Sequence, residues 1–338
     1  MVRVVGTDPG TSSLDLLLLV DGNVASQERL APETLQRDPA ALPALLQRWS
    51  PIDLVAGPSG YGLPLIRGDA LTAQHLEEMS LVRPDQRGVD TGVLGFRSWV
   101  RAVAASGFPV VFLPGGVHLP TIPAHRKLNT IDLGTADKVA VAALALHFEA
   151  SRSGGGWGGS TFAVVELGSA FSAVLVVERG RLVDAAAGTR GPIGARSGGC
   201  WDGEVAYWLS PLTKDHLFRG GLRDLGPDGP AAFRESLAKH VAGLQAVTPF
   251  ERIYLSGAAA DRPEIAALAR AALAPLGTLI PLDSLPGAWV KHAAQGSALL
   301  ADGLAGGRHA ELVASLEFAG ATGTVWDGLR LSQPGGPV

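Results

Sequence analysis

One turn near the start of the chain combines the residue types that bind phosphate. Residues 8–13 read Asp-Pro-Gly-Thr-Ser-Ser and lie between two mainly apolar stretches, residues 2–6 and 14–20. Gly10 and the neighbouring backbone N–H groups can surround phosphate oxygens, while the Asp8 carboxylate holds Mg²⁺ directly or through water. Three hydroxyl side chains complete the turn: Thr11, Ser12 and Ser13. The alternative interpretation is an ordinary hydrophilic hairpin.

A second acidic turn stands at the matching place in the second half of the chain. Glu166 lies near the end of the apolar stretch 161–167, and Gly168 and Ser169 follow it before the next apolar stretch, residues 173–177. Two turns that each combine an acid, a glycine and a hydroxyl favour a shared phosphate site, with Asp8 and Glu166 as the metal ligands.

A third turn follows the predicted strand at residues 252–255. It consists of Ser256, Gly257 and Ala258. A glycine here allows a flat ring or a sugar to approach the backbone closely. The alternative is a plain strand-to-helix turn.

Two aspartates five positions apart, Asp132 and Asp137, are further candidates. Neighbouring carboxylates can both bind a metal, or divide into a general base and a metal ligand. Asp137 also opens a predicted helix, where the helix dipole favours a carboxylate, so capping is its alternative role. We interpret Lys138 as a solvated side chain.

The glycine-rich loop at residues 188–196 contributes Arg190 and Arg196. Either guanidinium could neutralise a substrate carboxylate or a transferring phosphoryl group, although surface arginines are common. Weaker candidates are His118, His125 and Arg126, in an unpatterned loop. Cys200 is interpreted as a packed small residue, because no histidine lies close to it in the sequence.

The elements that must position these residues form an internal repeat. Each half is predicted to open with strand, glycine turn, strand, hairpin and strand, and then to alternate helix with strand. The strands of the first half are residues 2–6, 14–20, 24–30, 53–56 and 109–113. Those of the second half are residues 161–167, 173–177, 182–183, 252–255 and 279–280. The chain is therefore expected to be an α/β protein made of two similar units.

Two helices are predicted to cross between the halves, at residues 134–146 and 289–304. Gly296 lies inside the second, where glycine is about 1 kcal/mol less favourable than alanine. We therefore expect Gly296 to mark a close helix–helix contact. The flexible composition of residues 151–160 marks the expected boundary between the halves.

Composition excludes several classes of protein. Among 338 residues there are 28 Lys and Arg against 32 Asp and Glu, a net charge of −4, with no clustered basic stripe for nucleic acid. The single cysteine excludes an internal disulfide. The apolar run at residues 14–20 contains Asp15 and is far too short to cross a membrane. We expect a cytoplasmic protein that binds neither nucleic acid nor membrane; a homodimer stays open.

The three turns and two crossing helices resemble, in order, the phosphate turns, adenosine turn and connecting helices of the acetate and sugar kinase/Hsp70/actin superfamily. That resemblance implies two tandem ribonuclease H-like (actin-like ATPase) domains with a cleft between them. The expected domains are residues 1–150 and 151–331, with a flexible tail at 332–338. The resemblance also implies ATP and Mg²⁺. The superfamily more often has Asp-x-Gly-Gly in the second turn and Gly-Gly in the adenosine turn.

At finer grain, residues 58–64, 129–138 and 202–204 are similar to the family described as predicted butyrate kinases. Residues 134–138 are also similar to a segment of type III pantothenate kinases whose aspartate is catalytic. From these resemblances we assign Asp8, Asp132, Asp137 and Arg190 to catalysis. Residues assigned to the nucleotide are Gly10, Thr11, Ser12, Ser13, Glu166, Gly168, Ser169, Ser256, Gly257, Ala258 and Gly296. Residues assigned to the small-molecule acceptor are Ser59, Gly60, Asn129, Gly188 and Thr189.

The resemblance implies a phosphotransferase, and three functions stay open. The first is a kinase that phosphorylates a small carboxylate such as butyrate or acetate and forms an acyl phosphate. The second is a kinase of a small hydroxyl substrate, sugar or pantothenate-like, with Asp137 as the base. The third is a nucleotide-binding switch or scaffold without catalysis.

Overall fold

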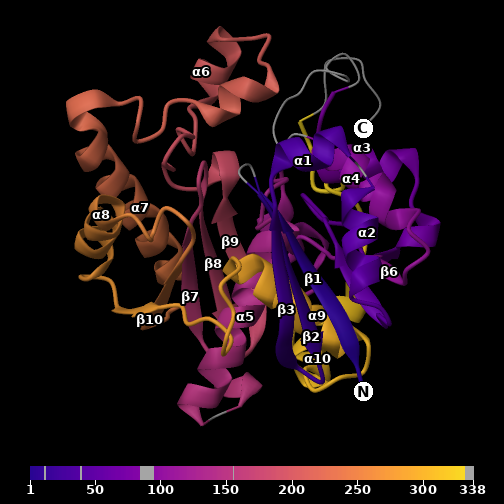
Figure 1. Cartoon of the computed structure of the whole chain (residues 1–338). Helices are drawn as coiled ribbons and strands as arrows, with labels where there is room; N and C mark the ends of the chain where they lie inside the picture. Colours follow the sequence, from indigo (N-terminus) through magenta and orange to yellow (C-terminus); the bar gives the residue numbers. More distant parts are fainter. Residues whose placement is uncertain (11–12, 39, 84–94, 155, 332–338) are drawn as a thin grey trace.

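The computed structural model describes residues 1–338 apart from 11–12, 39, 84–94, 155 and 332–338. Two mixed β-sheets stand at its centre (Figure 1). The first has the order β3-β2-β1-β4-β6-β5 and consists of β1 (Arg3–Pro9), β2 (Leu14–Val20), β3 (Asn23–Leu30), β4 (Leu54–Gly57), β5 (Ile66–Arg67) and β6 (Val110–Phe112). The second has the order β11-β10-β7-β8-β9 and consists of β7 (Phe162–Leu167), β8 (Ser172–Glu178), β9 (Arg181–Ala187), β10 (Arg252–Ser256) and β11 (Thr278–Pro281).

The two sheets repeat one topology, as the sequence predicted. β1, β2 and β3 form an antiparallel meander, and β4 and β6 add in parallel on the free side of β1. In the same way β7, β8 and β9 form an antiparallel meander, and β10 and β11 add in parallel on the free side of β7. The short strand β5 extends only the first sheet.

Both faces of each sheet are buried against helices. On β2, Leu14, Leu16 and Leu18 pack toward one core, while Leu17 and Leu19 belong to another. The outer face of the first sheet is covered by α2 (Ala41–Arg48) and α4 (Phe96–Ala104), with α1 (Pro32–Arg37) and α3 (Ala73–Ser80) beside them. The outer face of the second is covered by α7 (Gly229–Val247) and α8 (Pro263–Leu273). The apolar side chains of the sequence therefore form hydrophobic cores on both faces of each sheet.

Helices α5 (Ala136–Ser153) and α9 (His292–Leu304) pack against each other between the two sheets. The last long helix of the chain, α9, lies against β1, β2 and β4 of the first sheet, while α5 lies against β7 and β8 of the second. Small residues allow this closeness. A side chain on Gly296 would collide with the Ala140 carbonyl of α5, and one on Gly6 would collide with the α9 backbone at Ala298. The close helix contact predicted for Gly296 is confirmed.

The structure corrects several predicted boundaries. α5 continues through residues 151–153, which the sequence assigned to a linker, and ends where Gly154 takes φ +65°. α9 begins at His292 and not at Trp289, because the Trp289 and Val290 N–H groups donate to the Gln27 side chain. The elements α3, α6 (Gly203–Trp208), α10 (Ala310–Ser315) and β5 were not predicted. Among the described residues, no helix is long and apolar enough to cross a membrane.

Candidate nucleotide and phosphoryl-transfer site

The first predicted turn lies where β1 ends, at the carboxyl edge of the parallel strands where α/β proteins place their ligands. Asp8 is almost fully buried and lies opposite Asp15 of β2. The Gly10 N–H donates to the Ser13 carbonyl at 2.8 Å, which closes the turn. The Ser13 hydroxyl donates to Asp15 at 2.6 Å. The other two predicted hydroxyl ligands, Thr11 and Ser12, lie outside the described residues.

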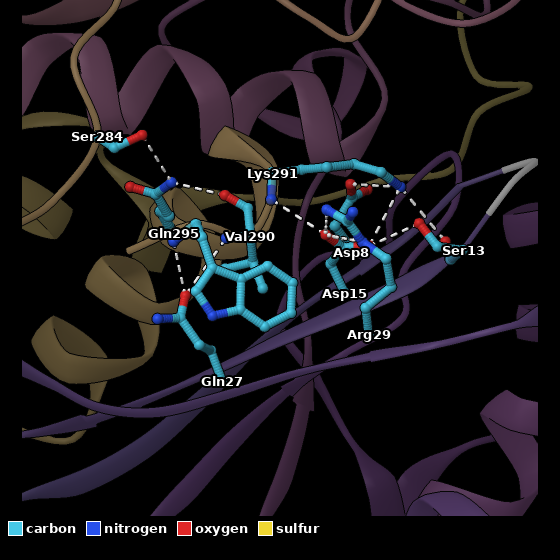
Figure 2. A network of polar contacts seen from close by, with 10 residues as sticks. Asp8, Ser13, Asp15, Gln27, Arg29, Ser284, Val290, Lys291 and Gln295 are labelled. Carbon is cyan, nitrogen blue, oxygen red and sulfur yellow. Dashed lines mark hydrogen bonds and ion pairs between the residues drawn. The ribbon is translucent and has the colours of Figure 1, made fainter. Parts of the chain in front are cut away.

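A lysine that sequence reasoning missed reaches into this turn from the start of α9. The Lys291 ammonium lies 3.4 Å from Asp8 Oδ2 and 3.6 Å from Asp15 Oδ1, and donates to the Ser13 carbonyl at 3.4 Å (Figure 2). Nζ would be 2.6 Å from a Cβ built on Gly10, so glycine at that position leaves the space for the ammonium. No local pattern distinguishes Lys291 from a surface lysine in the sequence.

The two aspartates of this turn differ in their electrostatics. Burial raises the pKa of Asp8 above its ordinary value, against the opposing charge of Lys291, and Asp137 raises it further. Burial also acts on Asp15, but hydrogen bonds from Arg29, the charge of Lys291 and the Ser13 hydroxyl lower its pKa. Arg29 Nη2 lies 2.7 Å from Asp15 Oδ2. Within the described part of the chain, Asp15 is therefore a fully paired structural carboxylate, whereas Asp8 pairs with Lys291 and has spare coordinating capacity.

A second charged cluster forms at the start of α5. The Lys138 ammonium lies 2.7 Å from Asp137 Oδ2 and 3.1 Å from Glu166 Oε2 of β7, so it joins the two halves. Thr135 donates its hydroxyl to the other oxygen of Asp137. Lys138 is thus a largely buried ion-pair residue and not the solvated side chain that the sequence suggested. Its adjacency to Asp137 is the signal that was available.

The charges of this cluster fix the ionisation of Asp137. Burial would raise its pKa, but the charge and hydrogen bond of Lys138 outweigh burial and lower it. Burial raises the pKa of Glu166, with Lys138 opposing and Asp137 and Asp8 adding to the shift. The predicted metal ligands Asp8 and Glu166 therefore lie within one electrostatic cluster, together with Asp137.

A small pocket lies beside this cluster, at the ends of β1, β4 and β6. Its lining residues are Thr7, Pro9, Gly57, Ser59, Gly60, Leu113, Ala136, Asp137 and Ser297. The predicted acceptor residues Ser59 and Gly60 thus line the same pocket as Asp137. The Ser59 hydroxyl donates to the Gly57 carbonyl at 2.7 Å and accepts the Leu113 N–H at 2.8 Å, so it also shapes the pocket wall.

Asp132 lies next to Gly188, near enough to Asp137 and Lys138 for their charges to act on it. A side chain on Gly188, where φ is +59°, would collide with the Asp132 carboxylate. Burial raises the pKa of Asp132 to about 6, against the Gly134 N–H, which donates to it at 3.0 Å. Burial also lowers the pKa of Lys214 to about 8, with the charge of Asp132 opposing. The Lys214 ammonium donates to the Tyr61 hydroxyl at 3.4 Å, a contact that sequence reasoning missed.

Three predicted site residues are used elsewhere. Asn129 is exposed and accepts the Arg330 N–H at 2.7 Å, which anchors the end of the described chain. Thr189 is exposed as well, and the exposed Arg190 donates to the Ala185 carbonyl at 3.0 Å. These contacts do not include the carboxylates of the two clusters.

The predicted adenosine turn lies against the second phosphate turn. Gly257 has φ +101°, and a side chain there would collide with the Leu167 carbonyl. The Ser256 hydroxyl lies 2.8 Å from His292 Nδ1, at the start of α9. Gly168 closes its own turn by donating to the Phe171 carbonyl at 2.9 Å. Ser169 is half-buried and Ala258 exposed beside these turns.

The remaining candidates have structural surroundings. His118 is buried, and burial lowers its pKa to about 4. Arg126 lies 3.3 Å from Asp184, whereas His125 is exposed. The Arg196 guanidinium stacks over Phe218 at 5.6 Å. Cys200 is exposed, which corrects the expectation that it is packed.

The cluster fits Mg²⁺ that is bound together with phosphate. Within the described part of the chain, no group of three or more His, Cys, Asp or Glu side chains is arranged to hold a metal. Mg²⁺ commonly takes only one or two protein carboxylates and completes its octahedron with water and phosphate oxygens. Asp8 and Glu166 can supply those carboxylates, and Glu166 Oε2 also pairs with the Lys138 ammonium at 3.1 Å.

Residues 6–331 match the sequence profile of DUF1464, a family described as proteins of unknown function. The chain belongs to this family. No curated protein sequence matches this member of it.

Solved structures confirm the fold of this DUF1464 member. A propionate kinase from Francisella tularensis subsp. tularensis SCHU S4 is similar with a TM-score of 0.58 and 13% identity, over 88% of this chain and 99% of that one. Acetate kinase from Entamoeba histolytica is similar with a TM-score of 0.53 and 12% identity, over 81% of this chain and 87% of that one. Acetate kinase from Porphyromonas gingivalis is similar with a TM-score of 0.53 and 12% identity, over 88% of this chain and 98% of that one. The predicted α/β fold of two similar units, with the architecture of these kinases, is confirmed.

Proposed function

We propose that the protein is an ATP- and Mg²⁺-dependent phosphotransferase whose acceptor is a small carboxylate. Asp8 and Glu166, from the facing turns of the two sheets, would hold Mg²⁺, which neutralises charge on the nucleotide phosphates when bound. The pocket that contains Ser59, Gly60 and Asp137 would receive the acceptor.

The pKa of Asp137 is the reason for proposing a carboxylate and not a hydroxyl group as the acceptor. A general base works best with a pKa near the working pH. Asp137 has the opposite property, because Lys138 lowers its pKa. A carboxylate acceptor needs no base, since it is already an anion. Its oxygen forms a bond to the γ-phosphorus while the bond from that phosphorus to the bridging oxygen breaks; ADP leaves and no proton moves.

The similar structures support the same choice. The three solved structures described above carry the names acetate kinase and propionate kinase. Their identities to this chain, 12 to 13%, establish a common fold, and the substrate assignment here rests on the Asp137 cluster.

One observation favours a second candidate, a kinase of a hydroxyl substrate. Asp132, with its pKa raised to about 6, is a better base than Asp137. In this alternative Asp132 would remove the hydroxyl proton, with Gly188 leaving room beside the carboxylate. The rate would then rise with pH through a pKa near 6.

A panel of acceptors separates the candidates. The protein is incubated with Mg-ATP and acetate, propionate, butyrate, glucose or pantothenate, and ADP release is measured beside trapping of acyl phosphate by hydroxylamine. We expect hydroxamate equal to the ADP released, with a carboxylic acid only. ADP release with an alcohol and no hydroxamate would establish the second candidate. Nucleotide binding without turnover on any acceptor would indicate a non-catalytic switch.

A further inference from the structure

The ammonium of Lys291 is loosely held although it lies among several oxygens. Among the described residues, its three nearest acceptors, on Asp8, Asp15 and Ser13, lie 3.4 to 3.6 Å away. A charge-assisted N–H···O contact is normally about 2.7–2.9 Å long. Asp15 is already satisfied by Arg29 and Ser13. Toward the described residues the ammonium therefore has unused donor capacity, and it lies beside Gly10, where a side chain would collide with it.

The backbone that carries Lys291 is, in contrast, fixed from two sides. The Gln27 side chain of β3 accepts the Trp289 N–H at 2.8 Å and the Val290 N–H at 3.3 Å (Figure 2). It also donates to the Gly287 carbonyl at 2.8 Å. From α9, the buried Gln295 accepts the Leu285 N–H at 2.7 Å and donates to the Val290 carbonyl at 2.7 Å. Such support is expected where a charged side chain must be placed accurately.

The same short segment also reaches the adenosine turn. His292, the next residue, lies 2.8 Å from the Ser256 hydroxyl through Nδ1 and 3.3 Å from Ser284 through Nε2. Two adjacent residues at the start of α9 thus contact the first phosphate turn and the adenosine turn, which belong to different sheets. A nucleotide that spans both turns would pass Lys291 at its phosphate end.

We propose that Lys291 is a phosphate-binding residue, which pairs with Asp8 in the free protein and with the terminal phosphates of a bound nucleotide. This inference rests on the proposed function and adds a residue that acts on phosphate independently of Mg²⁺. Transfer of the ammonium from Asp8 to phosphate would leave the Asp8 carboxylate available to a metal. A purely structural counter-ion would affect all ligands of the site equally.

The test compares ligands with and without phosphate in the absence of metal. Binding of ADP and of adenosine is measured by calorimetry in EDTA for the full chain, Lys291→Met and Lys239→Met. Lys239 is the matched control, because it is an exposed lysine of α7 that pairs with Glu235 one helical turn away. We expect Lys291→Met to weaken ADP about 10-fold or more, with adenosine unchanged, because a hydrogen bond to a charged group is lost. Lys239→Met should change neither affinity.

A second variant tests the inference even if Lys291→Met does not fold. Gln27→Leu removes the hydrogen bonds that hold residues 287–290 without changing any charge, so it should weaken ADP but not adenosine. Wild-type affinity of Lys291→Met for ADP, or equal losses for ADP and adenosine, would overturn the inference. If the protein forms acyl phosphate but Lys291→Met binds ADP normally, this inference alone is overturned. If ADP binding depends on Lys291 but no acceptor is phosphorylated, only the proposed function is overturned. If the protein does not bind ADP, both are overturned.

Discussion

At the scale of single residues, the buried carboxylate of Asp8 is the group most directly tied to metal and phosphate. Asp8→Asn should lower kcat about 10²-fold or more, because one charged ligand of the transferring group is lost. The folded state already disfavours the ionised form of Asp8, so the melting temperature should change little. ADP release and calorimetry measure both, with the exposed Asp69→Asn as control. Near-normal turnover in folded Asp8→Asn would reduce Asp8 to a structural residue.

Asp132 gives a pH dependence of stability whose sign is fixed. Its pKa rises on folding from 3.8 to about 6, so the folded state binds the proton more tightly than the unfolded state. Its contribution is fully present below pH 3.8 and is lost as pH rises through about 6. Asp132→Asn should therefore stabilise the protein at pH 7.5, by about 2–3 kcal/mol at most, and have little effect near pH 3.5. Urea unfolding at pH 7.5 and at pH 3.5 measures this change in the free energy of unfolding. A larger stabilisation at pH 3.5 than at pH 7.5 would contradict the prediction.

At the scale of elements, the contact of α5 with α9 tests how the halves are joined. Gly296→Ala should destabilise the protein by about 1–3 kcal/mol, because the new Cβ collides with the Ala140 carbonyl. Gly243, in the second-last turn of α7, is the matched control with nothing near its missing side chain. Gly243→Ala should stabilise by up to about 1 kcal/mol through helix propensity. Equal effects of the two substitutions in urea unfolding would show that the helices can separate.

Elements and isolated turns were predictable from sequence, whereas partnerships across the halves were not. Strand alternation and glycine turns located Asp8, Glu166 and Gly257, and the misfit of glycine in a helix located the contact at Gly296. Lys291 lay inside the helix predicted at residues 289–304, and Lys214 lay in a segment without periodicity. Both were missed because their partners are far away in sequence. Asn129 fitted a motif, yet its side chain binds the backbone of Arg330.

At the scale of the whole molecule, a nucleotide that contacts both sheets should stabilise both. A ligand that binds only the native state adds about 2.7 kcal/mol at a hundredfold excess over Kd. Mg-ATP should therefore raise the melting temperature of a single cooperative transition, and Asp8→Asn should reduce the rise. Scanning calorimetry with and without Mg-ATP checks this. Neither heat of binding nor a shift at millimolar Mg-ATP would remove the basis of the kinase proposal.

The packing of α9 on β1 also has a consequence for how the chain is made. Val4, Leu17 and Leu19 of the first sheet share one core with α9, and Gly6 touches the helix directly. A ribosome adds Ala298 186 residues after Phe112, the last residue of that sheet, which at ordinary elongation rates is a delay of roughly 9–37 s. During that interval the emerging first half has a finished sheet with one apolar face uncovered. The nascent chain should therefore be a client of chaperones until α9 has left the exit tunnel.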